Sequence, residues 1–381
     1  MDFDFSDDQE MLRDSVRKWV DKGYSFERRR GIVKEGGFSR AVWRELAELG
    51  LTGLAVPEAH GGMGFGPVDA MVVMEELGRG IVLEPYAQGA LIAGGVLSAH
   101  APEAVKATWL PRIAGGEALV VLAHQERAAR YRLSHVTAKA AAGNGGPWTV
   151  SGAKSVVPVG DQADAFIVPA RVSGAVDDDA GIALFLVERN SAGVSTRGYP
   201  TQDGARAAEV TFANAPATLI AAAGSGLDAL ELAADIGIAA LCAEAVGVMD
   251  KMLVATTEYM NTRKQFGVAI GTFQALRHRI ADVKMQLELA RSMSYFASLK
   301  MNEPPAARRR ALSQAKWQLG QSMRFVGQQC IQLHGGIGVT DEYIASHYFK
   351  RLTVMEMSWG DSLHHLGEVS ARMQATAGVF A

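Results

Sequence analysis

The feature that most constrains the fold is a set of long helical seams in the last third of the chain. Apolar residues recur at intervals of three and four over residues 273–287, as on a helix face that packs against other helices. This seam comprises Phe273, Leu276, Ile280, Val283 and Leu287, and a second one comprises Leu312, Ala315, Leu319, Val326, Cys330 and Leu333. Residues 227–261 contain no proline and predict a further long helix. The seams predict an antiparallel bundle, with solvent-exposed faces that carry Arg277, Arg279, Lys284 and Arg291.

The middle of the chain differs from the last third in segment length and residue composition. Between residues 119 and 224 the segments are short and β-branched, and turn-forming Gly and Asp residues separate them. Residues 209–213 alternate between apolar and polar, whereas residues 183–187 are apolar throughout, as in a fully buried strand. The first segment opens with Ser6 and Gln9 in a capping-box pattern and is mainly helical. We therefore predict a mainly α fold with a central β domain, divided into an N-terminal helical domain (1–118), a middle β domain (119–224) and a C-terminal helical bundle (225–381).

Charge and cysteine usage exclude several classes of function. The formal net charge is -3, so the chain as a whole offers no basic field for nucleic acid. The two cysteines, Cys242 and Cys330, lie in helical patterns without metal-ligand spacing, which predicts core residues and no metal site. The acidic start and the lack of an uncharged apolar run of about 18 residues predict a cytoplasmic protein without membrane insertion.

Two motifs in the last segment carry the chemistry. The first, "TRKQFGVAIGTFQ" (262–274), joins two predicted helices, and Arg263 near a helix C-terminus is also explained by the helix dipole. The second, "QLHGGIGVT" (332–340), lacks the Lys and Ser/Thr of a P-loop, and no predicted strand precedes it. Its glycines are consistent either with a helix C-cap or with backbone N–H groups that approach a phosphate or a flat cofactor.

Together these motifs resemble those of the acyl-CoA dehydrogenase family, and the resemblance spans almost the whole chain. It implies that the middle domain is β-barrel-like and that the C-terminal domain is a four-helix bundle. "PEAHGGMGFG" (57–66) and "EELGR" (75–79) are similar to the family's N-terminal pattern, and "VSGAKSVV" (150–157) and "DQADAFIVPAR" (161–171) to its middle-domain pattern. The resemblance implies a FAD enzyme in which a carboxylate removes the α-proton of an acyl-CoA thioester and the β-hydrogen leaves as hydride to the flavin. It also implies an electron acceptor such as electron-transfer flavoprotein, and a place in fatty acid or sterol side-chain metabolism.

The resemblance also assigns cofactor contacts. It makes six residues contacts for the ADP half of FAD: Arg263, Phe266, Gln274, Gln332, Gly335 and Gly336. A guanidinium donates a planar fork to pyrophosphate oxygens, and glycine lets the backbone come close. In the family this flavin has its ring mainly in the neighbouring subunit, so the six residues are expected to act across an interface.

The family's catalytic base is missing from both of its usual positions. Trp359 stands where the Glu of a Tyr-Glu-Gly-Thr run would be, and Gly237 occupies the alternative position on the first long helix of the bundle. The catalytic residue is therefore unknown, and Asp361 is a weak candidate that is also expected to cap the last helix. Asp235 and Glu244 are further candidates for a displaced base, or ordinary helix-surface carboxylates.

The flavin-ring side departs from the family as well. Gln125, Glu126 and Arg127 replace Thr-Glu-Pro, and Val156, Val157 and Pro158 replace the Trp-Ile-Thr that packs on the ring. Glu126 is expected to face the ligand channel or to form a surface ion pair with Arg127 or Arg130.

The motifs for the nucleotide half of the cofactor are retained, whereas the positions for the base and the flavin ring are altered. Three hypotheses follow from this contrast. The first is the accessory subunit of a heteromeric acyl-CoA dehydrogenase, such as a heterotetramer, similar to the small subunit of pimeloyl-CoA dehydrogenase, in which a homologous subunit supplies the base and the ring pocket. The second is a self-sufficient homo-oligomeric dehydrogenase with a displaced base. The third is a catalytically silent scaffold of the same fold.

Overall fold

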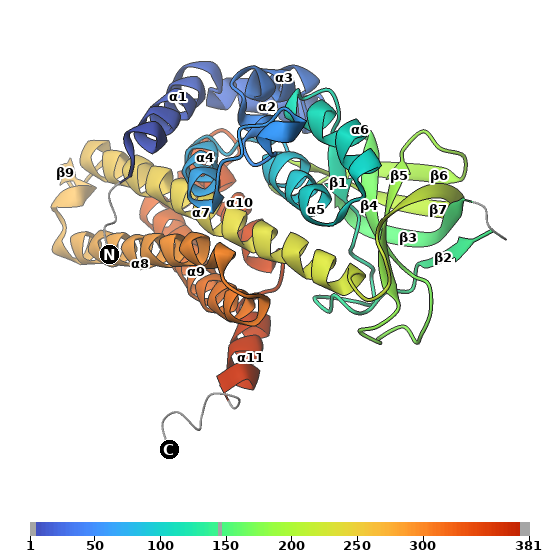
Figure 1. The fold of residues 1–381 in the computed structure, drawn as a ribbon. Coiled ribbons are helices and arrows are strands. Elements are labelled where there is room, and N and C mark those ends of the chain that lie inside the picture. Colours follow the sequence, from blue (N-terminus) through green and yellow to red (C-terminus); the bar gives the residue numbers. More distant parts are fainter. Residues whose placement is uncertain (1–4, 144–146, 374–381) are drawn as a thin grey trace. The chain divides into compact units, whose positions relative to one another are not determined.

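The computed structural model describes residues 5–143 and 147–373 (Figure 1). The chain forms two compact units that do not follow chain order. One unit comprises the described residues within 1–30, 67–82 and 238–381, and the other comprises those within 31–66 and 83–237. The division after residues 118 and 224 stays a prediction, because the units are defined by packing and not by a cut between consecutive segments.

The N-terminal segment is helical, as predicted. Its helices are α1 (Asp7–Gly23), α2 (Phe26–Lys34), α3 (Arg40–Glu48), α4 (Pro67–Arg79), α5 (Ala93–His100) and α6 (Glu103–Ala114). The capping box is present: the Gln9 N–H donates to Ser6 Oγ at 3.3 Å, and the Ser6 N–H donates to Gln9 Oε1 at 3.2 Å. These two bonds satisfy backbone donors that the first turn of α1 would otherwise leave open.

The middle segment forms a mainly antiparallel barrel, in which one closing contact is parallel and a further parallel strand is added. Its strands are β1 (Val120–Leu122), β2 (Lys139–Ala142), β3 (Trp148–Pro158), β4 (Ala165–Arg171), β5 (Ile182–Glu188), β6 (Val194–Pro200) and β7 (Arg206–Ala221). The ring closes through the pairs β4–β5, β5–β7, β7–β3 and β3–β2, and a single parallel contact of β2 with β4; β1 pairs parallel to β4, and β6 pairs with β7 outside the ring. Every residue of β4 is buried, and β5 is buried up to its last residue, which confirms the prediction for its apolar run.

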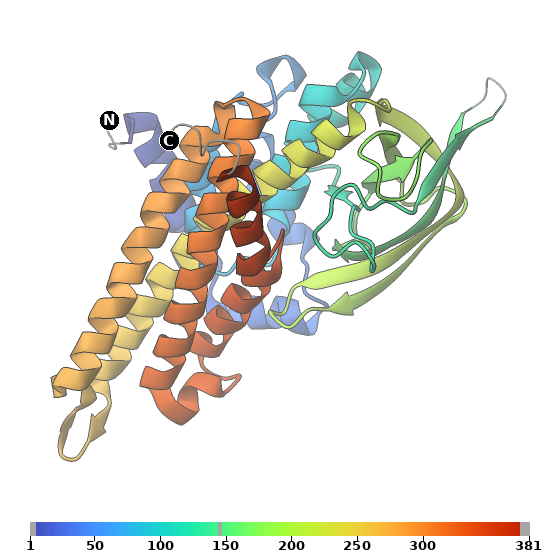
Figure 2. The same cartoon turned by 90° about the horizontal axis from the view of Figure 1, so that it is seen from below.

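The C-terminal segment is a bundle of long helices. They are α7 (Gly226–Thr262), α8 (Gln274–Leu299), α9 (Pro305–His334), α10 (Ile344–Met357) and α11 (Ser362–Met373), and the short strands β8 (Lys264–Gln265) and β9 (Val268–Ala269) connect α7 to α8. Figure 2 shows α7, α8 and α9 running side by side, with the β8–β9 hairpin projecting from one end. The fold class predicted from the sequence is thereby confirmed.

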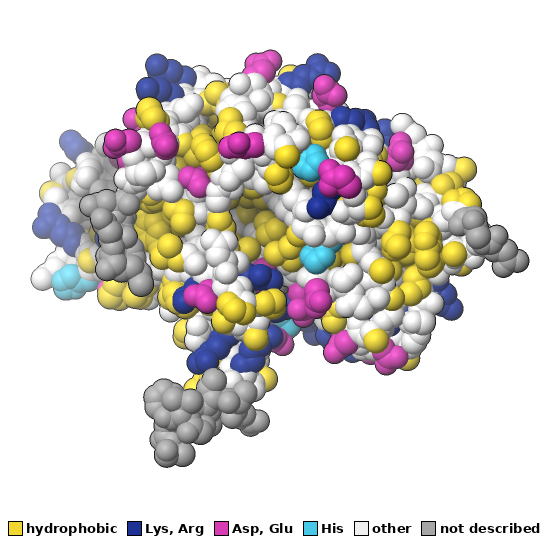
Figure 3. All heavy atoms as spheres, viewed as in Figure 1, with side chains coloured by type: hydrophobic (Ala, Val, Ile, Leu, Met, Phe, Trp, Pro, Cys, Tyr) yellow, Lys and Arg dark blue, Asp and Glu magenta, His cyan; other side chains and the backbone are white. Residues whose placement is uncertain are grey.

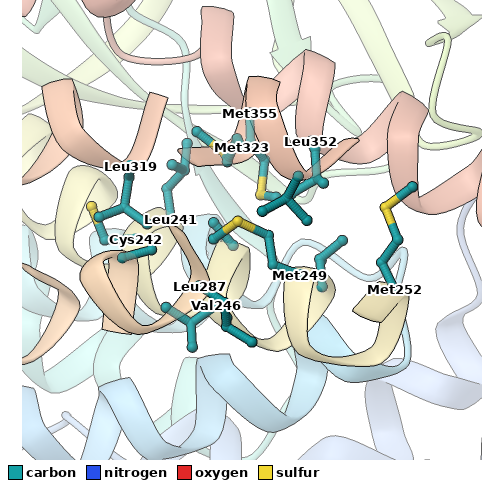
Figure 4. Packing of buried hydrophobic residues seen from close by; sticks show 14 of the residues in the cluster. Leu241, Cys242, Val246, Met249, Met252, Leu287, Leu319, Met323, Leu352 and Met355 are labelled. Atoms are coloured by element: carbon teal, nitrogen blue, oxygen red, sulfur yellow. The ribbon is translucent and has the colours of Figure 1, made fainter. Parts of the chain in front are cut away.

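The interior of the bundle is built from the predicted seams. Leu241, Val246 and Met249 of α7 pack against side chains of α8, α9 and α10 (Figure 4). Both cysteines are free, and each has 0% of its surface exposed. By length and composition α7 could cross a membrane, but 89% of its apolar window is buried inside the protein, as in the core helix of a bundle.

One predicted surface residue is not on the surface. Arg291 is partly buried and pairs with Glu75, with Asp250 at 3.4 Å and with Glu288 at 3.5 Å. The helix periodicity placed it on a polar face, but α4 packs against that face of α8 and supplies Glu75. Arg277, Arg279 and Lys284 are exposed, as predicted.

Candidate active site

The β8–β9 hairpin presents an aromatic side chain to solvent. Lys264 pairs with Ala269 and Gln265 pairs with Val268, so Phe266 and Gly267 form a two-residue turn. Both have left-handed backbone, with φ of 55° and 80°, as a type I′ turn requires. Left-handed backbone is uncommon for a bulky residue, yet Phe266 adopts it and is 92% exposed. The Phe266 side chain is therefore available to a group outside this chain.

Arg263 lies at the base of the same hairpin. Its N–H donates to the Tyr259 carbonyl at 2.8 Å, and its carbonyl accepts from the Ile270 N–H at 2.8 Å, so its backbone closes the hairpin. Its side chain is exposed, and the guanidinium has no hydrogen-bond or ion-pair partner among the described residues. Gln274, the first residue of α8, is exposed as well. The backbone of Arg263 thus ends α7 while its side chain remains free to bind.

The glycine pair that follows α9 has open space around it. Gly335 has φ of 63° and ψ of -141°. A Cβ atom built on Gly335 or Gly336 would meet nothing within 4 Å, whereas one on Gly338 would lie 2.8 Å from the His334 Cβ. Gly338 is explained by packing within the chain. Gly336 is not, and an outside group that approaches the backbone would account for it.

Aromatic rings hold the two motifs at the same end of the bundle. The His334 ring lies 4.7 Å from the Tyr259 ring and 5.1 Å from the Tyr343 ring, measured between centroids. Since Tyr259 precedes the hairpin and His334 precedes the glycine pair, the predicted cofactor contacts gather at this end. These contacts are Arg263, Phe266, Gln274, Gln332, Gly335 and Gly336, and their binding to a cofactor stays a prediction.

The turn after α10 carries no carboxylate at the position to which the resemblance assigns the usual base. Trp359 occupies it with φ of 59°, and its partly buried indole packs against the bundle core. The next residue, Gly360, also has left-handed backbone, with φ of 105°. An indole accepts no proton, so Trp359 cannot act as the base.

A buried lysine that the sequence analysis missed secures this turn. Lys316 of α9 has 0% of its surface exposed, and its Nζ donates to the carbonyls of Glu356 and Gly360, both at 2.8 Å. Burial lowers the pKa of Lys316 to about 8, although Cys242, Glu356 and Asp361 oppose the shift. Its position between Leu312 and Leu319 placed it within a predicted seam, which was the available signal.

Asp361 caps the following helix. Its Oδ1 accepts from the His364 N–H at 2.8 Å, so it satisfies a donor in the first turn of α11, as expected for a helix cap.

Asp235 and Glu244, the two candidate carboxylates of α7, are not surface residues. Asp235 is 1% exposed and Glu244 is 7% exposed. Glu244 accepts two hydrogen bonds from Arg351, from Nε at 2.6 Å and from Nη2 at 2.7 Å. The surface alternative is therefore wrong for both residues, because they lie in the part of α7 whose apolar window is 89% buried inside the protein. Gly237, the alternative position for a base, is buried in the same helix.

Glu126 forms a buried ion pair in place of the contacts expected for it. Its carboxylate accepts from Lys154 Nζ at 2.7 Å, from the Thr137 N–H at 2.8 Å and from the Ala138 N–H at 3.1 Å. Burial would raise the pKa of Glu126, but Lys154 and the Thr137 hydrogen bonds outweigh it and lower the pKa. Arg127 pairs instead with Glu209, at 3.7 Å. No local pattern predicts this pair, because β3 brings Lys154 to Glu126 from 28 residues away.

The same ion pair fixes the two segments that the resemblance places at the flavin ring. The Ser155 N–H donates to the Gln125 carbonyl at 2.8 Å, so these segments lie side by side in the barrel. The register of β3 against β7 shifts between Lys154 and Val157, and Val156 in the shift has φ of 52° and is 47% exposed. A small aliphatic side chain therefore stands at the position to which the resemblance assigns a stacking indole.

No metal centre is evident in the part of the chain that the structure describes. No three His, Cys, Asp or Glu side chains there are grouped so that they could hold a metal ion.

Comparison with known proteins identifies the family. Family models match residues 6–117 (acyl-CoA dehydrogenase, N-terminal domain), 122–215 (middle domain) and 224–374 (C-terminal domain). The chain belongs to the acyl-CoA dehydrogenase family. Acyl-CoA dehydrogenase FadE27 of Mycobacterium tuberculosis is 26% identical over 99% of this chain and 100% of its own length. Mitochondrial isovaleryl-CoA dehydrogenase of Oryza sativa subsp. japonica is 27% identical over 94% of this chain and 89% of its own.

A solved structure of this family has a closely similar fold. It is the ChsE4-ChsE5 complex from Mycobacterium tuberculosis, which matches with a TM-score of 0.88 and 26% identity over 98% of this chain and 99% of that chain. Acyl-CoA dehydrogenases are FAD-dependent oxidoreductases, so the enzyme class and cofactor predicted from the resemblance are supported. The residues at the hairpin and the glycine pair fit the nucleotide end of such a cofactor, because they combine an exposed guanidinium with open backbone.

Proposed function

We propose that this chain is the accessory subunit of a heteromeric acyl-CoA dehydrogenase, which oxidises the Cα–Cβ bond of an acyl-CoA thioester with FAD. One observation carries the proposal. The groups suited to a nucleotide are exposed and open at one end of the bundle, whereas both positions for a base lack a carboxylate. A homologous dehydrogenase subunit supplies the base and the ring pocket in this proposal.

The chain's own residues bind and orient the ADP half of the cofactor. The Arg263 guanidinium donates to pyrophosphate oxygens, and the backbone at Gly335 and Gly336 approaches the nucleotide without side chains in the way. Phe266 offers its ring to the cofactor or to the subunit that holds it. A bound flavin would supply a hydride acceptor, and an acceptor such as an electron-transfer flavoprotein would then take up the electrons.

Two of the three candidates for a displaced base, Asp361 and Glu244, are already engaged. Asp361 accepts from the backbone of α11, and Glu244 accepts from Nε and Nη2 of Arg351. A general base must reach the proton that it removes, and a carboxylate fixed in a bidentate ion pair is a poor acceptor. These engagements favour a base supplied by the partner over a displaced base in this chain.

An apolar face of the bundle suits contact with a second subunit of the same fold. On α8 the side chains Met285, Leu289, Met293 and Phe296 follow one another at intervals of four, four and three. Met285 is 54% exposed and Leu289 is 46% exposed. Farther along the same stripe, Met293 and Phe296 line a groove of about 470 Å³ together with Gln314, Trp317, Gln318, Leu366 and Val369.

A second bundle is the occupant that fits this face. A helical stripe of this spacing packs into the groove of another helix, and monomeric proteins rarely leave such a surface uncovered. Around α11, apolar side chains lie beside Lys and Arg side chains on the face seen in Figure 3, as at the rim of a protein interface. The ChsE4-ChsE5 complex is a precedent within the family for an assembly of two different chains.

The test is to purify the chain alone and after co-expression with a homologous acyl-CoA dehydrogenase chain from the same genome. We expect little flavin absorption from the chain alone, and a flavin-loaded complex whose absorption bleaches when acyl-CoA is added. Flavin bound by the chain alone that bleaches with acyl-CoA would overturn the proposal. A chain that stays flavin-free with every homologous partner would overturn it too and indicate a silent scaffold.

The interface can be tested in the same complex. Leu289→Arg places a charge on the apolar stripe and is expected to abolish co-purification of the partner. Lys284→Glu, on an exposed position of the same helix, is the matched control and is expected to retain the partner.

A further inference from the structure

A buried arginine from the N-terminal segment contacts the bundle behind the glycine-pair loop. Arg29 of α2 is 1% exposed, and its Nε donates to the Ile81 carbonyl at 2.9 Å. Its Nη1 lies 3.3 Å from Nδ1 of His347, on α10. His347 is 8% exposed, and the Phe26 ring packs edge-on against it at 4.9 Å between centroids.

Arginine fixes which nitrogen of His347 carries the proton. A guanidinium has donors only, so Nδ1 of His347 must be the acceptor. The neutral ring then carries its proton on Nε2, which lies 3.0 Å from the carbonyl of Asp341 and donates to it. Arg29 thus orients His347 as a donor toward the Asp341 backbone.

The Asp341 backbone belongs to the loop that carries the glycine pair. This loop connects α9 to α10 and contains the 3-10 turn Gly335–Val339. Lys350 Nζ also binds the loop, donating to Asp341 Oδ1 at 2.8 Å. The Asp341 side chain is 71% exposed, so its ion pair with Lys350 is a weak restraint compared with the buried His347 contact.

From this series of contacts we infer that Arg29 and His347 are positioning residues for the loop that carries the glycine pair. They hold the backbone after Gly335 and Gly336 in the conformation that receives a nucleotide, although neither belongs to a motif for cofactor binding. The inference rests on the proposed function, because it assigns the loop to the ADP half of FAD.

The groups that face His347 give the arrangement a pH dependence. They are Arg29 from α2, Asp341 from the loop and Lys350 from α10. Burial lowers the pKa of His347, the Asp341 carbonyl opposes the shift, and Arg29 adds to it. The pKa of His347 is lower in the folded chain than in the unfolded chain. The stability contributed by neutral His347 is therefore present above its unfolded pKa and is lost as the pH falls through its folded pKa. Protonation of Nδ1 would replace the Arg29 hydrogen bond with repulsion.

The test compares His347→Phe, His347→Gln and Arg29→Met in the flavin-loaded complex. Phe retains the ring but loses both hydrogen bonds, whereas the Gln amide can still donate to the Asp341 carbonyl. Ser322→Ala is the control for stability alone, because Ser322 Oγ bonds Gln286 Oε1 at 3.0 Å between α8 and α9. Two quantities are measured: the rate of FAD loss on dilution, and amide hydrogen exchange of residues 335–343 in the full chain.

We expect His347→Phe and Arg29→Met to speed both FAD loss and loop exchange on the order of tenfold, which corresponds to about 1.4 kcal/mol. Gln should restore most of the protection, and Ser322→Ala should change neither quantity. In the unsubstituted chain, loop exchange corrected for its intrinsic rate should accelerate at acid pH, and His347→Gln should flatten that profile.

The outcomes separate this inference from the proposed function. Unchanged loop exchange in His347→Phe overturns the inference, whatever the complex does. Faster exchange together with an unchanged rate of FAD loss also overturns it, since the loop would then not hold the cofactor. If Arg263→Ala leaves FAD loss unchanged as well, the cofactor role of this end of the bundle fails and the proposed function falls with it.

Discussion

The carboxylate of Asp361 accepts a hydrogen bond from the backbone N–H of His364, three residues farther along, at 2.8 Å. This contact makes Asp361 the cap of α11, and a cap and a catalytic base respond differently to substitution. Asp361→Asn keeps a cap of nearly equal strength and removes the acid, whereas Asp361→Ala removes both.

We predict that Asp361→Asn leaves the turnover of the assembled enzyme unchanged and that Asp361→Ala lowers its stability by about 1 kcal/mol. Acyl-CoA-dependent dye reduction and thermal unfolding check the two parts. A loss of turnover of more than about a hundredfold in Asp361→Asn would restore this residue as the base.

Arg263→Ala is predicted to weaken FAD retention by the complex on the order of tenfold to a hundredfold, the range for a charge-assisted hydrogen bond. The unfolding temperature should not change, because the Arg263 side chain has no partner among the described residues. Lys264→Ala, at the next exposed position, is the control and should retain flavin. Equal flavin content in all three proteins would remove Arg263 from the site.

The two open glycines are predicted to respond in different ways. Gly336→Ala should fold normally, since its Cβ meets nothing within 4 Å and its backbone is not left-handed, yet it should lower FAD content by placing a methyl group toward the cofactor. Gly335→Ala should also cost on the order of 1 kcal/mol of stability or more, because its φ of 63° with ψ of -141° is strained for any side chain. Calorimetry and flavin absorbance of the purified complexes distinguish the two effects. Full flavin content in Gly336→Ala would show that no cofactor lies there.

The buried pair of Glu126 and Lys154 supports a prediction about the β domain. Lys154→Met leaves a buried carboxylate without its cation and should destabilise the chain by about 3–5 kcal/mol. Lys154→Met combined with Glu126→Gln removes both charges and should recover part of that loss. Urea unfolding of the single and double variants measures the difference, and equal losses would mean that the charges are not coupled.

The same pair sets a dependence on pH. Since the pKa of Glu126 is lowered in the folded chain, its contribution to stability is present above the unfolded pKa and is lost as the pH falls through the folded pKa. Acid unfolding should therefore occur at a higher pH in Lys154→Met than in the unsubstituted chain.

Periodicity predicted the elements well because it follows from burial. The seam from Phe273 to Leu287 became α8, the proline-free run became α7, and the capping box at Ser6 begins α1. What periodicity could not supply was the identity of partners distant in sequence. Arg291 was predicted to be exposed, but in the structure it pairs with Glu75 of α4. Glu244 had a surface position as one alternative, but it binds Arg351, which is 107 residues away in the sequence.

The candidate site was predictable only where a motif carried it. The hairpin and the glycine pair were located by their residues, and the bundle brings both to one end. Arg29, Lys316 and His347 belong to no such motif, because a positioning residue is defined by the backbone carbonyl or side chain that it reaches. A lysine within an apolar seam is a local signal of this kind, and it can be sought in other sequences.

The anchoring of the turn after α10 has a consequence for what residue 359 can become. Lys316 holds the main-chain oxygens of Glu356 and Gly360, and it makes no demand on the side chain between them. The contacts that fix the backbone of this turn are thus independent of the side chain at residue 359. The backbone path of this turn is therefore set from α9 rather than by residue 359.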